Sequence, residues 1–201
     1  MPMRIAICVS GRGSNLVALL DALRGEPLAE PVLVLSNRAD APALERARER
    51  GVAAEPFDDG KNAAEWLERL TRHRVDLIVL AGYLKLVPAA VIAAYRGRIL
   101  NIHPALLPAF GGPGMFGSHV HEAVIASGAT HSGATVHLVD ERYDEGAILA
   151  QARVLLLPGD TPDTLAARVL AVEHLLLPAV VLAAARAGHP IPLPEPLALP
   201  A

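Results

Sequence analysis

The sequence predicts an α/β fold with a doubly wound, mostly parallel twisted sheet, an antiparallel C-terminal strand pair and a long C-terminal helix. Three observations predict it. Over the first half of the chain, short apolar runs alternate with helical patterns through short connections, which is typical of parallel strands covered by helices on both faces. Beyond residue 130, two strand patterns follow each other directly. A last helical pattern then continues to Gly188.

Five apolar runs predict the parallel strands, and helical patterns separate them. The runs lack the alternation of half-buried strands, which is typical of strands covered on both faces. The predicted strands are residues 4–9, 31–36, 52–56, 76–80 and 98–103, and the predicted helices are residues 16–23, 42–50, 63–73 and 88–95. Strands of such sheets commonly follow the order 3-2-1-4-5, with right-handed crossovers.

The pattern changes after the fifth strand. Residues 109–117 form a glycine-rich loop that is too long for a plain turn, as expected for a lid or a recognition loop. The elements predicted to follow are a short helix over 120–126 and two strands over 134–139 and 148–156. Thr161 and Pro162 supply a capping hydroxyl and a first-turn proline for the last helix, which Gly188 ends.

Length and composition fit one folded domain. A chain of this length buries roughly 70% of the surface that it exposes when unfolded. Apolar residues make up 52% of the chain and aromatic residues 3%, so Ala, Leu and Val must build the core. We expect a single domain over residues 1–188 and a proline-rich C-terminal tail over 189–201.

Charge, cysteine content and hydropathy argue against several classes of protein. The formal net charge is −3 and no basic face stands out, which disfavours a nucleic-acid partner. The single cysteine, Cys8, permits no internal disulfide, as expected in a reducing cytoplasm. The N-terminus lacks a signal-peptide pattern, and the apolar run at 175–185 is shorter than the roughly 20 residues of a membrane span. We therefore expect a cytoplasmic protein with no membrane partner.

The polar residues at the end of the fifth strand are the strongest candidates for chemistry. Asn101 and His103 are two residues apart, so their side chains point to the same side of a strand. Pro104 ends the strand, because proline lacks a backbone donor and fixes φ. Open α/β sheets bind ligands at this end of their strands. The alternative is a strand end with a satisfied polar pair.

The glycine loop after the first strand predicts an anion site. A dinucleotide fingerprint fails here, because Leu16 replaces its third glycine and no acidic residue ends the second strand. The Gly-Lys-Ser/Thr of a P-loop is also missing. What remains is a set of backbone N–H groups at a helix N-terminus, which suits one phosphate monoester; a structural turn is the alternative. The candidate residues are Gly11, Arg12, Gly13, Ser14 and Asn15.

The expected strand order relates these two features in space. Strands one and five would lie two strand spacings apart, roughly 10 Å. A ligand with its phosphate at the glycine loop and its reacting group beside Asn101 and His103 would span a ribose. This suggests a sugar phosphate with a reactive substituent at C1.

A carboxylate near His103 would hold its tautomer and favour the imidazolium form. On sequence alone, four acids of one loop compete for that role, namely Asp140, Glu141, Asp144 and Glu145. The pair His119 and His121 has no nearby ligand to complete a metal site, so helix capping or surface exposure is expected for both. His137 is expected to be a satisfied buried residue on its strand.

Two further segments bear on ligand binding. Glu173 lies within an apolar helix, so its carboxylate needs a partner, such as an amine or a hydroxyl of a ligand. Tyr83 and the residues that follow it stand after the fourth strand, at the predicted binding edge. They would form either core or the lining of a flat apolar pocket.

Together these residues resemble the phosphoribosylglycinamide formyltransferases of purine biosynthesis, a branch of the folate-dependent formyltransferase family. The similarity extends from Arg4 to about Gly188. Its motifs are ICVSGRGSNL at 7–16, SNRADA at 36–41, VLAGYLKLV at 79–87, LNIHPALLP at 100–108, TVHLVDE at 135–141 and ARVLAVEH at 167–174. Two departures concern loop geometry: the loop 110–118 is longer than the common form, and Glu145 stands where a glycine often follows the aspartate.

The resemblance implies a Rossmann-like formyltransferase fold and a set of roles. The implied catalytic residues are Asn101, His103 and Asp144. The implied ribonucleotide contacts are Gly11, Arg12, Gly13, Ser14, Asn15, Pro104 and Glu173. The implied folate contacts are Leu84, Lys85, Leu86, Val87, Asn101, Asp140 and Lys61, with Asn62 as the alternative to Lys61.

The resemblance also implies a reaction. The formyl group of 10-formyltetrahydrofolate, a co-substrate, passes to the amine of 5-phosphoribosylglycinamide, and no metal is needed. Asn101 and a protonated His103 would stabilise the oxyanion, while Asp144 keeps His103 protonated and helps to move the amine proton. The expected partners are these small molecules, and a homodimer is left open.

Three alternatives stand beside this prediction. A methionyl-tRNA formyltransferase or a formyltetrahydrofolate hydrolase would share the chemistry, but each carries an additional domain for which we expect no room in this chain. The third alternative is a nucleotide-binding module without turnover, against which the polar residues at the end of the fifth strand argue.

Overall fold

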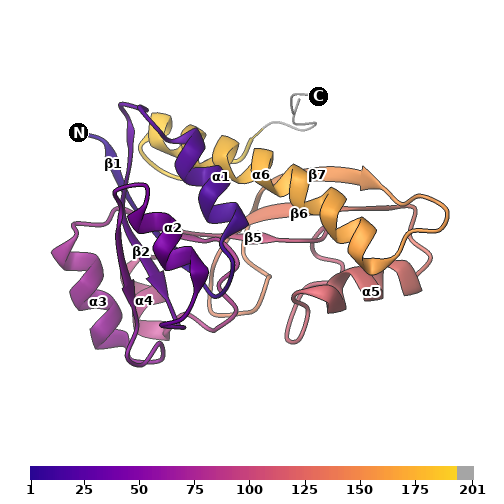
Figure 1. Cartoon of the computed structure of the whole chain (residues 1–201), viewed down its shortest axis with the longest axis horizontal. Helices are drawn as coiled ribbons and strands as arrows, with labels where there is room; N and C mark the ends of the chain where they lie inside the picture. Colours follow the sequence, from indigo (N-terminus) through magenta and orange to yellow (C-terminus); the bar gives the residue numbers. More distant parts are fainter. Residues whose placement is uncertain (194–201) are drawn as a thin grey trace.

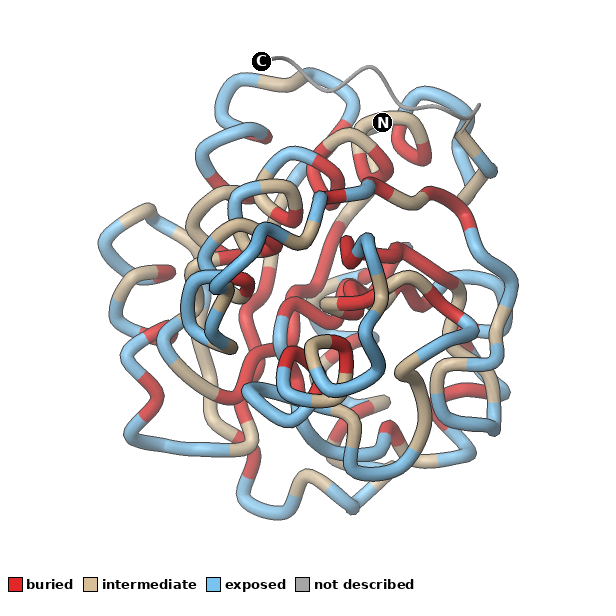
Figure 2. The backbone as a smooth tube through the Cα atoms, turned by 90° about the vertical axis from the view of Figure 1, so that its right-hand side faces the viewer, coloured by how far each residue is buried: buried red, intermediate tan, exposed pale blue. Residues whose placement is uncertain are grey.

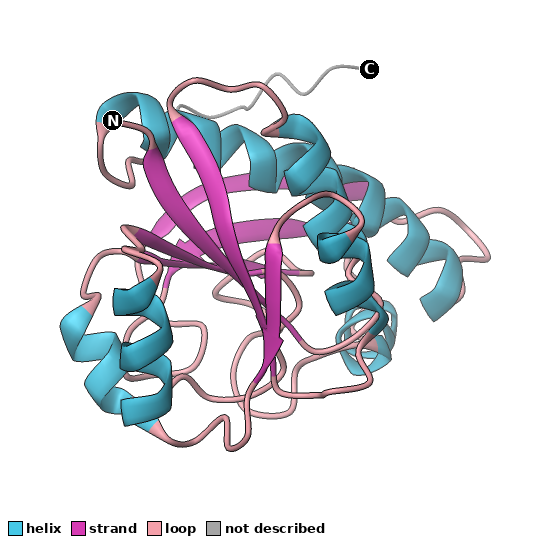
Figure 3. Cartoon of the chain, turned by 60° about the vertical axis from the view of Figure 1, so that its left-hand side comes forward, coloured by secondary structure: helices cyan, strands magenta, loops and turns pink. Residues whose placement is uncertain are grey.

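Seven strands form one sheet in the order β3-β2-β1-β4-β5-β6-β7, with helices on both faces (Figure 1, Figure 3). The computed structural model describes residues 1–193, so the last part of the predicted tail, 194–201, lies outside the described residues. The strands are β1 (Met3–Val9), β2 (Ala29–Ser36), β3 (Ala53–Pro56), β4 (Leu77–Leu80), β5 (Ile99–His103), β6 (His131–Leu138) and β7 (Ile148–Leu155). The helices are α1 (Ser14–Ala22), α2 (Pro42–Arg48), α3 (Ala63–Arg72), α4 (Ala89–Ala94), α5 (Ser118–Ala126) and α6 (Pro162–Ala187).

The pairing of the strands confirms the predicted fold class. The first five strands pair in parallel, in the predicted order 3-2-1-4-5. β6 pairs antiparallel with both β5 and β7, which makes the C-terminal pair an extension of the parallel sheet. Each predicted element is present, and its ends differ from the prediction by no more than three residues.

The largest difference lies at the start of β6, which begins at His131 and not at residue 134. Its next residues, Ser132 and Gly133, have no apolar side chain, so the sequence pattern did not include them. Gly133 is needed at this position, because a Cβ there would lie 2.0 Å from the carbonyl oxygen of Ala152 on β7. Glycine in a strand interior commonly marks such a close backbone approach.

The two faces of the sheet are covered by two hydrophobic cores. Successive side chains of β1 point into different cores: Ile5 and Ile7 are buried in one core, and Ala6 and Cys8 in the other. The first core packs beneath α1, α2 and α6, and the second beneath α3 and α4. Buried segments gather in the middle of the molecule, surrounded by exposed loops and helix faces (Figure 2).

The long helix α6 closes the fold. Thr161 caps it as predicted, with a side chain that accepts a hydrogen bond from the amide of Thr164, and Gly188 ends it at a φ of 79°. By length and composition α6 is the one helix among residues 1–193 that meets the requirements of a membrane span. It packs against α1, α5, β6 and β7, and ten of its side chains are buried, including Leu176 and Val180.

The order of strands creates a crevice at the carboxyl ends of β1 and β4. β1 continues into α1 on one face, whereas β4 leads to α4 on the other face. The chain therefore leaves these adjacent strands in opposite directions, which creates a topological switch point at their carboxyl ends. Ligands of open α/β sheets bind at such points.

Candidate active site

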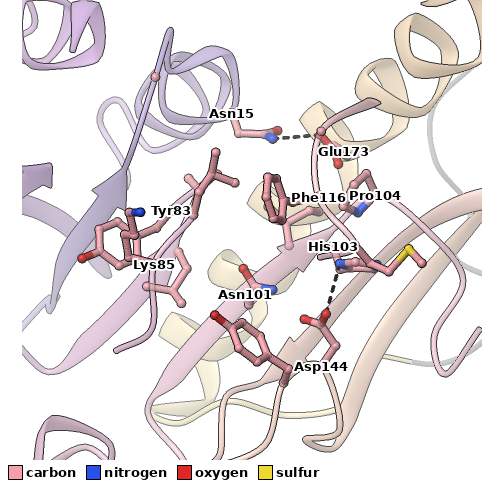
Figure 4. A pocket seen from close by; sticks show the side chains of 18 of the residues that line it. Asn15, Tyr83, Lys85, Asn101, His103, Pro104, Phe116, Asp144 and Glu173 are labelled. Carbon is pink, nitrogen blue, oxygen red and sulfur yellow. Dashed lines mark hydrogen bonds and ion pairs between the residues drawn. The ribbon is translucent and has the colours of Figure 1, made fainter. Parts of the chain in front are cut away.

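A cavity of about 540 Å³ opens at the carboxyl ends of β1, β4 and β5 (Figure 4). It brings together the two regions that the sequence predicted to share a cleft, the glycine loop at 11–15 and the strand end at 101–104. The rest of the lining comes from residues within 80–87, 112–118 and 137–144, from Ile92 and His121, and from the N-terminal half of α6. The cavity therefore offers an anion-binding loop and a polar strand end to one ligand space.

The glycine loop has the backbone geometry of an anion site. Gly13 is the N-cap residue of α1 and has a φ of +77°. A Cβ at this position would lie 2.6 Å from Cβ of Ala43, so only glycine fits. Because glycine has no side chain to cap the helix, the first amides of α1 remain for a ligand, where the helix dipole favours negative charge.

Asn15 and Glu173 form a buried pair on the wall of the cavity (Figure 4). Nδ2 of Asn15 donates a 2.8 Å hydrogen bond to Oε2 of Glu173. Burial raises the pKa of Glu173, and this hydrogen bond opposes the rise. Oδ1 of Asn15, which is also buried, has no hydrogen-bond partner among residues 1–193. The partner that the sequence required for Glu173 is thus a protein amide.

Asp144 is the one acid of its loop that reaches His103. Its Oδ2 lies 3.7 Å from Nδ1 of His103 and accepts a 2.9 Å hydrogen bond from the amide of Gly112. The other three acids have different partners: Asp140 accepts from the amide of Arg142, Glu141 pairs with Arg96, and Glu145 pairs with Arg142. The structure thus resolves the four-way choice that the sequence left open.

His103 is held on two sides, by the Phe110 carbonyl and by Asp144. Nε2 donates a 2.8 Å hydrogen bond to the carbonyl of Phe110, since a carbonyl oxygen only accepts. Burial lowers the pKa of His103 below its ordinary value, although the carboxylate of Asp144 and the Phe110 carbonyl act in the opposite direction. Desolvation of the ring therefore opposes the predicted imidazolium form of His103, whereas the carboxylate of Asp144 favours it.

Asp144 itself stays ionised. Its burial would raise the pKa, but the nearby rings of His137 and His103 and the hydrogen bond from the Gly112 amide outweigh that effect and lower it. The backbone of Asp144 has a φ of 55°, and that of Phe110 has a φ of 56°. The carboxylate of Asp144 and the carbonyl of Phe110, which flank His103, thus both belong to non-glycine residues in the left-handed region. This backbone conformation costs energy and persists only where the surrounding structure enforces it.

The chain matches the formyl transferase family model over residues 3–181. This chain belongs to the formyl transferase family. Among curated relatives, it is 45% identical over 186 residues to the chloroplastic phosphoribosylglycinamide formyltransferase of Arabidopsis thaliana, covering 89% of this chain and 64% of that protein. It is 38% identical over 186 residues to the phosphoribosylglycinamide formyltransferase of Escherichia coli K12, covering 89% of this chain and 85% of that protein. The chain therefore spans less than two thirds of the plant relative.

Solved structures of the same family share the fold. The glycinamide ribonucleotide transformylase 1 of Symbiobacterium toebii superposes with a TM-score of 0.86 at 41% identity, covering 92% of this chain and 89% of that one. The phosphoribosylglycinamide formyltransferase of Brucella melitensis superposes with a TM-score of 0.83 at 42% identity, covering 96% and 99%. The sheet described above is thus the formyltransferase fold that the sequence predicted.

Two histidines of this formyl transferase lie in the site, although the sequence did not predict them as site residues. His137 lies opposite Asn101 across β5 and β6; its Nε2 is 2.9 Å from Nδ2 of Asn101 and 3.5 Å from Oδ1 of Asp144. It is buried as expected, but as part of the site. His121 is 5% exposed and lines the cavity, so the expectation of a cap or a surface residue is wrong for it. The two-residue period of side chains along a strand could have placed His137 on one face of the sheet. Only the pairing of β5 with β6 shows that Asn101 is its partner.

The predicted folate segment forms one wall of the cavity. Leu84, Lys85, Leu86 and Val87 all line it, as does Asp140. Leu84 and Leu86 are 51% and 58% exposed, so this wall presents apolar surface to a ligand. Lys61 lies outside the lining, in an exposed turn, and the side chain of Asn62 caps α3 by accepting from the amides of Ala64 and Glu65. The structure brings neither candidate of that pair to the cavity.

Proposed function

We propose that this formyl transferase passes the formyl group of 10-formyltetrahydrofolate to the amine of 5-phosphoribosylglycinamide. The products are formylglycinamide ribonucleotide and tetrahydrofolate, a step of de novo purine biosynthesis. One observation carries the proposal: the anion loop at 11–15 and the group of Asn101, His103 and Asp144 line the same cavity. The relatives named phosphoribosylglycinamide formyltransferase support it.

The ribonucleotide would occupy the α1 side of the cavity. Amides at the start of α1, with the hydroxyl of Ser14 and the guanidinium of Arg12, would bind its phosphate. The ribose and the glycinamide arm would then extend past Asn15 and Glu173 toward Pro104. A ribose hydroxyl would donate to Glu173 or to the unsatisfied Oδ1 of Asn15.

The folate would occupy the β4 side. A flat pterin ring suits the apolar wall formed by Leu84, Leu86 and Val87, and the backbone groups of that segment offer hydrogen bonds to its polar edge. Lys85 provides a cation at the same wall for an anionic tail. The residues present therefore fit a folate, which supplies a formyl group already activated on a nitrogen atom.

The polar group at the end of β5 would stabilise charge on the reacting oxygen. One hydrogen of the Asn101 amide points to Nε2 of His137, which leaves its second hydrogen for a formyl oxygen that gains negative charge. Donors of this kind are worth about 3–4 kcal/mol in the transition state. His137 orients the amide, because the Leu138 carbonyl holds a proton on its Nδ1 and makes Nε2 the acceptor.

His103 and Asp144 would move the proton of the attacking amine. Nε2 of His103 donates to the Phe110 carbonyl, so Nδ1, which faces Asp144, is the atom that would take up the proton of the amine. Negative charge that develops beside the ring favours this uptake, and the carboxylate then stabilises the imidazolium. His103 would thus hold the proton while the amine adds to the formyl carbon, and would pass it to the folate nitrogen as the bond between that nitrogen and the formyl carbon breaks.

A spectroscopic assay tests the proposal. The purified protein is mixed with 10-formyltetrahydrofolate or a formylated analogue, with and without the ribonucleotide, and the release of the deformylated folate is followed. Release that requires the ribonucleotide supports the proposal. Release of formate without it would indicate a hydrolase, formylation of methionyl-tRNA would indicate the tRNA enzyme, and binding without release would indicate a nucleotide-binding module.

Several expectations remain predictions. They are a cytoplasmic location, a single domain over residues 1–188, and the absence of metal, membrane and nucleic-acid partners. Among residues 1–193, no group of three or more His, Cys, Asp and Glu side chains is placed to hold a metal ion.

A further inference from the structure

Ser10 is the first residue after β1, and its side chain lies outside the cavity lining, behind it. It is 5% exposed. Its Oγ accepts a 2.8 Å hydrogen bond from the amide of Leu84 and donates a 2.5 Å hydrogen bond to Oδ1 of Asn37. One hydroxyl therefore connects the chain after β1 with the chain after β4 and the chain after β2.

The position of this hydroxyl follows from the switch point. β1 and β4 are neighbours in the sheet, but the chain leaves them toward opposite faces, so the strand ladder cannot continue between their loops. The last backbone contact runs from the amide of Ser10 to the carbonyl of Gly82 at 3.0 Å. Gly82, with a φ of +81°, then turns the chain away, and the Ser10 hydroxyl meets the amide of Leu84, two residues further on.

The two loops joined here are the two ligand walls. Ser10 directly precedes the glycine loop at 11–15, and Leu84 begins the apolar wall at 84–87. The glycine loop has a second support, a hydrogen bond from the amide of Ala43 to the carbonyl of Gly11 at 3.3 Å. The hydroxyl therefore matters more for the placement of Leu84 than for the placement of the glycine loop.

We infer that Ser10 is a positioning residue that sets the place of the folate wall relative to the ribonucleotide loop. The inference rests on the proposed function. Asn37 contributes by accepting the hydroxyl proton, which turns a lone pair of Oγ toward Leu84. Without the hydroxyl, the amide of Leu84 loses its partner and the 84–87 segment loses its fixed position, while the amides at the start of α1 keep theirs.

The experiment compares three single variants with the wild type. Ser10→Ala removes the hydroxyl, and Ser10→Thr keeps it. Ser132→Ala is the matched control, because Ser132 is also a buried serine, 2% exposed, whose Oγ has no hydrogen-bond partner among residues 1–193. For each protein, calorimetry measures the binding of a folate analogue and of the ribonucleotide separately, and the assay above measures KM and kcat.

We expect Ser10→Ala to weaken folate-analogue binding about tenfold and to change ribonucleotide binding less than twofold. Ser10→Thr should restore most of the folate affinity, and Ser132→Ala should match the wild type. Unchanged folate binding in Ser10→Ala would overturn the inference. So would an equal loss of both affinities, because a merely structural role moves both together.

A second substitution keeps the test decisive where Ser10→Ala does not fold. Asn37→Leu removes the acceptor of the hydroxyl proton, whereas Asn37→Asp retains an acceptor oxygen at the same position. We expect Asn37→Leu to weaken folate binding more than Asn37→Asp does. Equal effects would refute the role of Asn37 as the acceptor that orients the Ser10 hydroxyl. A wild type without turnover contradicts the proposed function and this inference together, whereas an active wild type with an indistinguishable Ser10→Ala refutes this inference alone.

Discussion

The side-chain amide nitrogen of Asn15 lies 2.8 Å from a carboxylate oxygen of Glu173, although the two residues are 158 positions apart in the chain. The contact joins α1 to α6 on the wall of the cavity (Figure 4). This hydrogen bond satisfies only some of the polar atoms of the pair, because Oδ1 of Asn15 has no partner among the described residues 1–193. A partly satisfied buried pair at a cavity wall is suited to take up a polar ligand.

Glu173→Gln should therefore separate ligand binding from stability. The glutamine carbonyl can still accept from Asn15, so the melting temperature should stay close to that of the wild type, while the KM for the ribonucleotide rises about tenfold. Thermal unfolding and steady-state kinetics measure the two effects. Glu173→Ala is the comparison, and should lower the melting temperature as well, because it leaves the Asn15 amide without an acceptor. An unaltered KM in Glu173→Gln would contradict a ribonucleotide contact.

Asp144→Asn should lower kcat by about 10²–10³-fold and change both KM values little, because the carboxylate acts on the charge that develops at His103 during the reaction. Steady-state kinetics with each substrate varied in turn measures this. Glu145→Gln is the matched control, since Glu145 is the next acid in the loop but is exposed and pairs with Arg142. Equal turnover in Asp144→Asn and the wild type would remove Asp144 from the mechanism.

Ser14→Ala should raise the KM for the ribonucleotide by about five- to tenfold and leave the KM for the folate unchanged. The reason is the place of Ser14 at the start of α1, in the glycine loop that would bind the phosphate of the ribonucleotide. The same assay with either substrate varied decides it. A defect confined to the folate would reverse the assignment of the two walls.

The stability of the protein should fall as the pH falls below about 6.5. Burial lowers the pKa of His103, His121 and His174 below the ordinary value of 6.5. The unfolded chain therefore binds more protons than the folded chain between that value and the lowered ones, so the free energy of unfolding decreases with decreasing pH. Urea unfolding at pH 7.5, 6.5 and 5.5 measures this slope.

The variant His121→Asn isolates one contribution to that slope. Nδ1 of His121 has no hydrogen-bond partner among residues 1–193, so replacing the ring breaks no recorded bond at that atom. Burial raises the pKa of Glu173, which contributes with the opposite sign, and comparison with the wild type cancels it. We expect a shallower slope in His121→Asn, and an identical slope in both proteins would show that His121 titrates alike when folded and unfolded.

Local patterns predicted the elements of this fold because each depends on neighbouring residues. The apolar run at Leu77–Leu80 and the cap at Thr161 followed from spacing and residue type, and the structure confirms them. The start of β6 was missed because Gly133 is required by a strand that comes later in the chain. Asn101 and His103 were found because strand geometry alone places them on one side.

By itself the sequence determined the order of strands and helices, the glycine loop at 11–15 and the polar strand end at 101–104. Only the tertiary structure decided that Asp144 reaches His103, that His137 joins Asn101, and that burial lowers the pKa of His103. The physical reason is that proximity across strands and the loss of water around a ring both depend on segments far apart in the chain. A local sequence pattern therefore does not predict how deeply a titratable side chain will be buried.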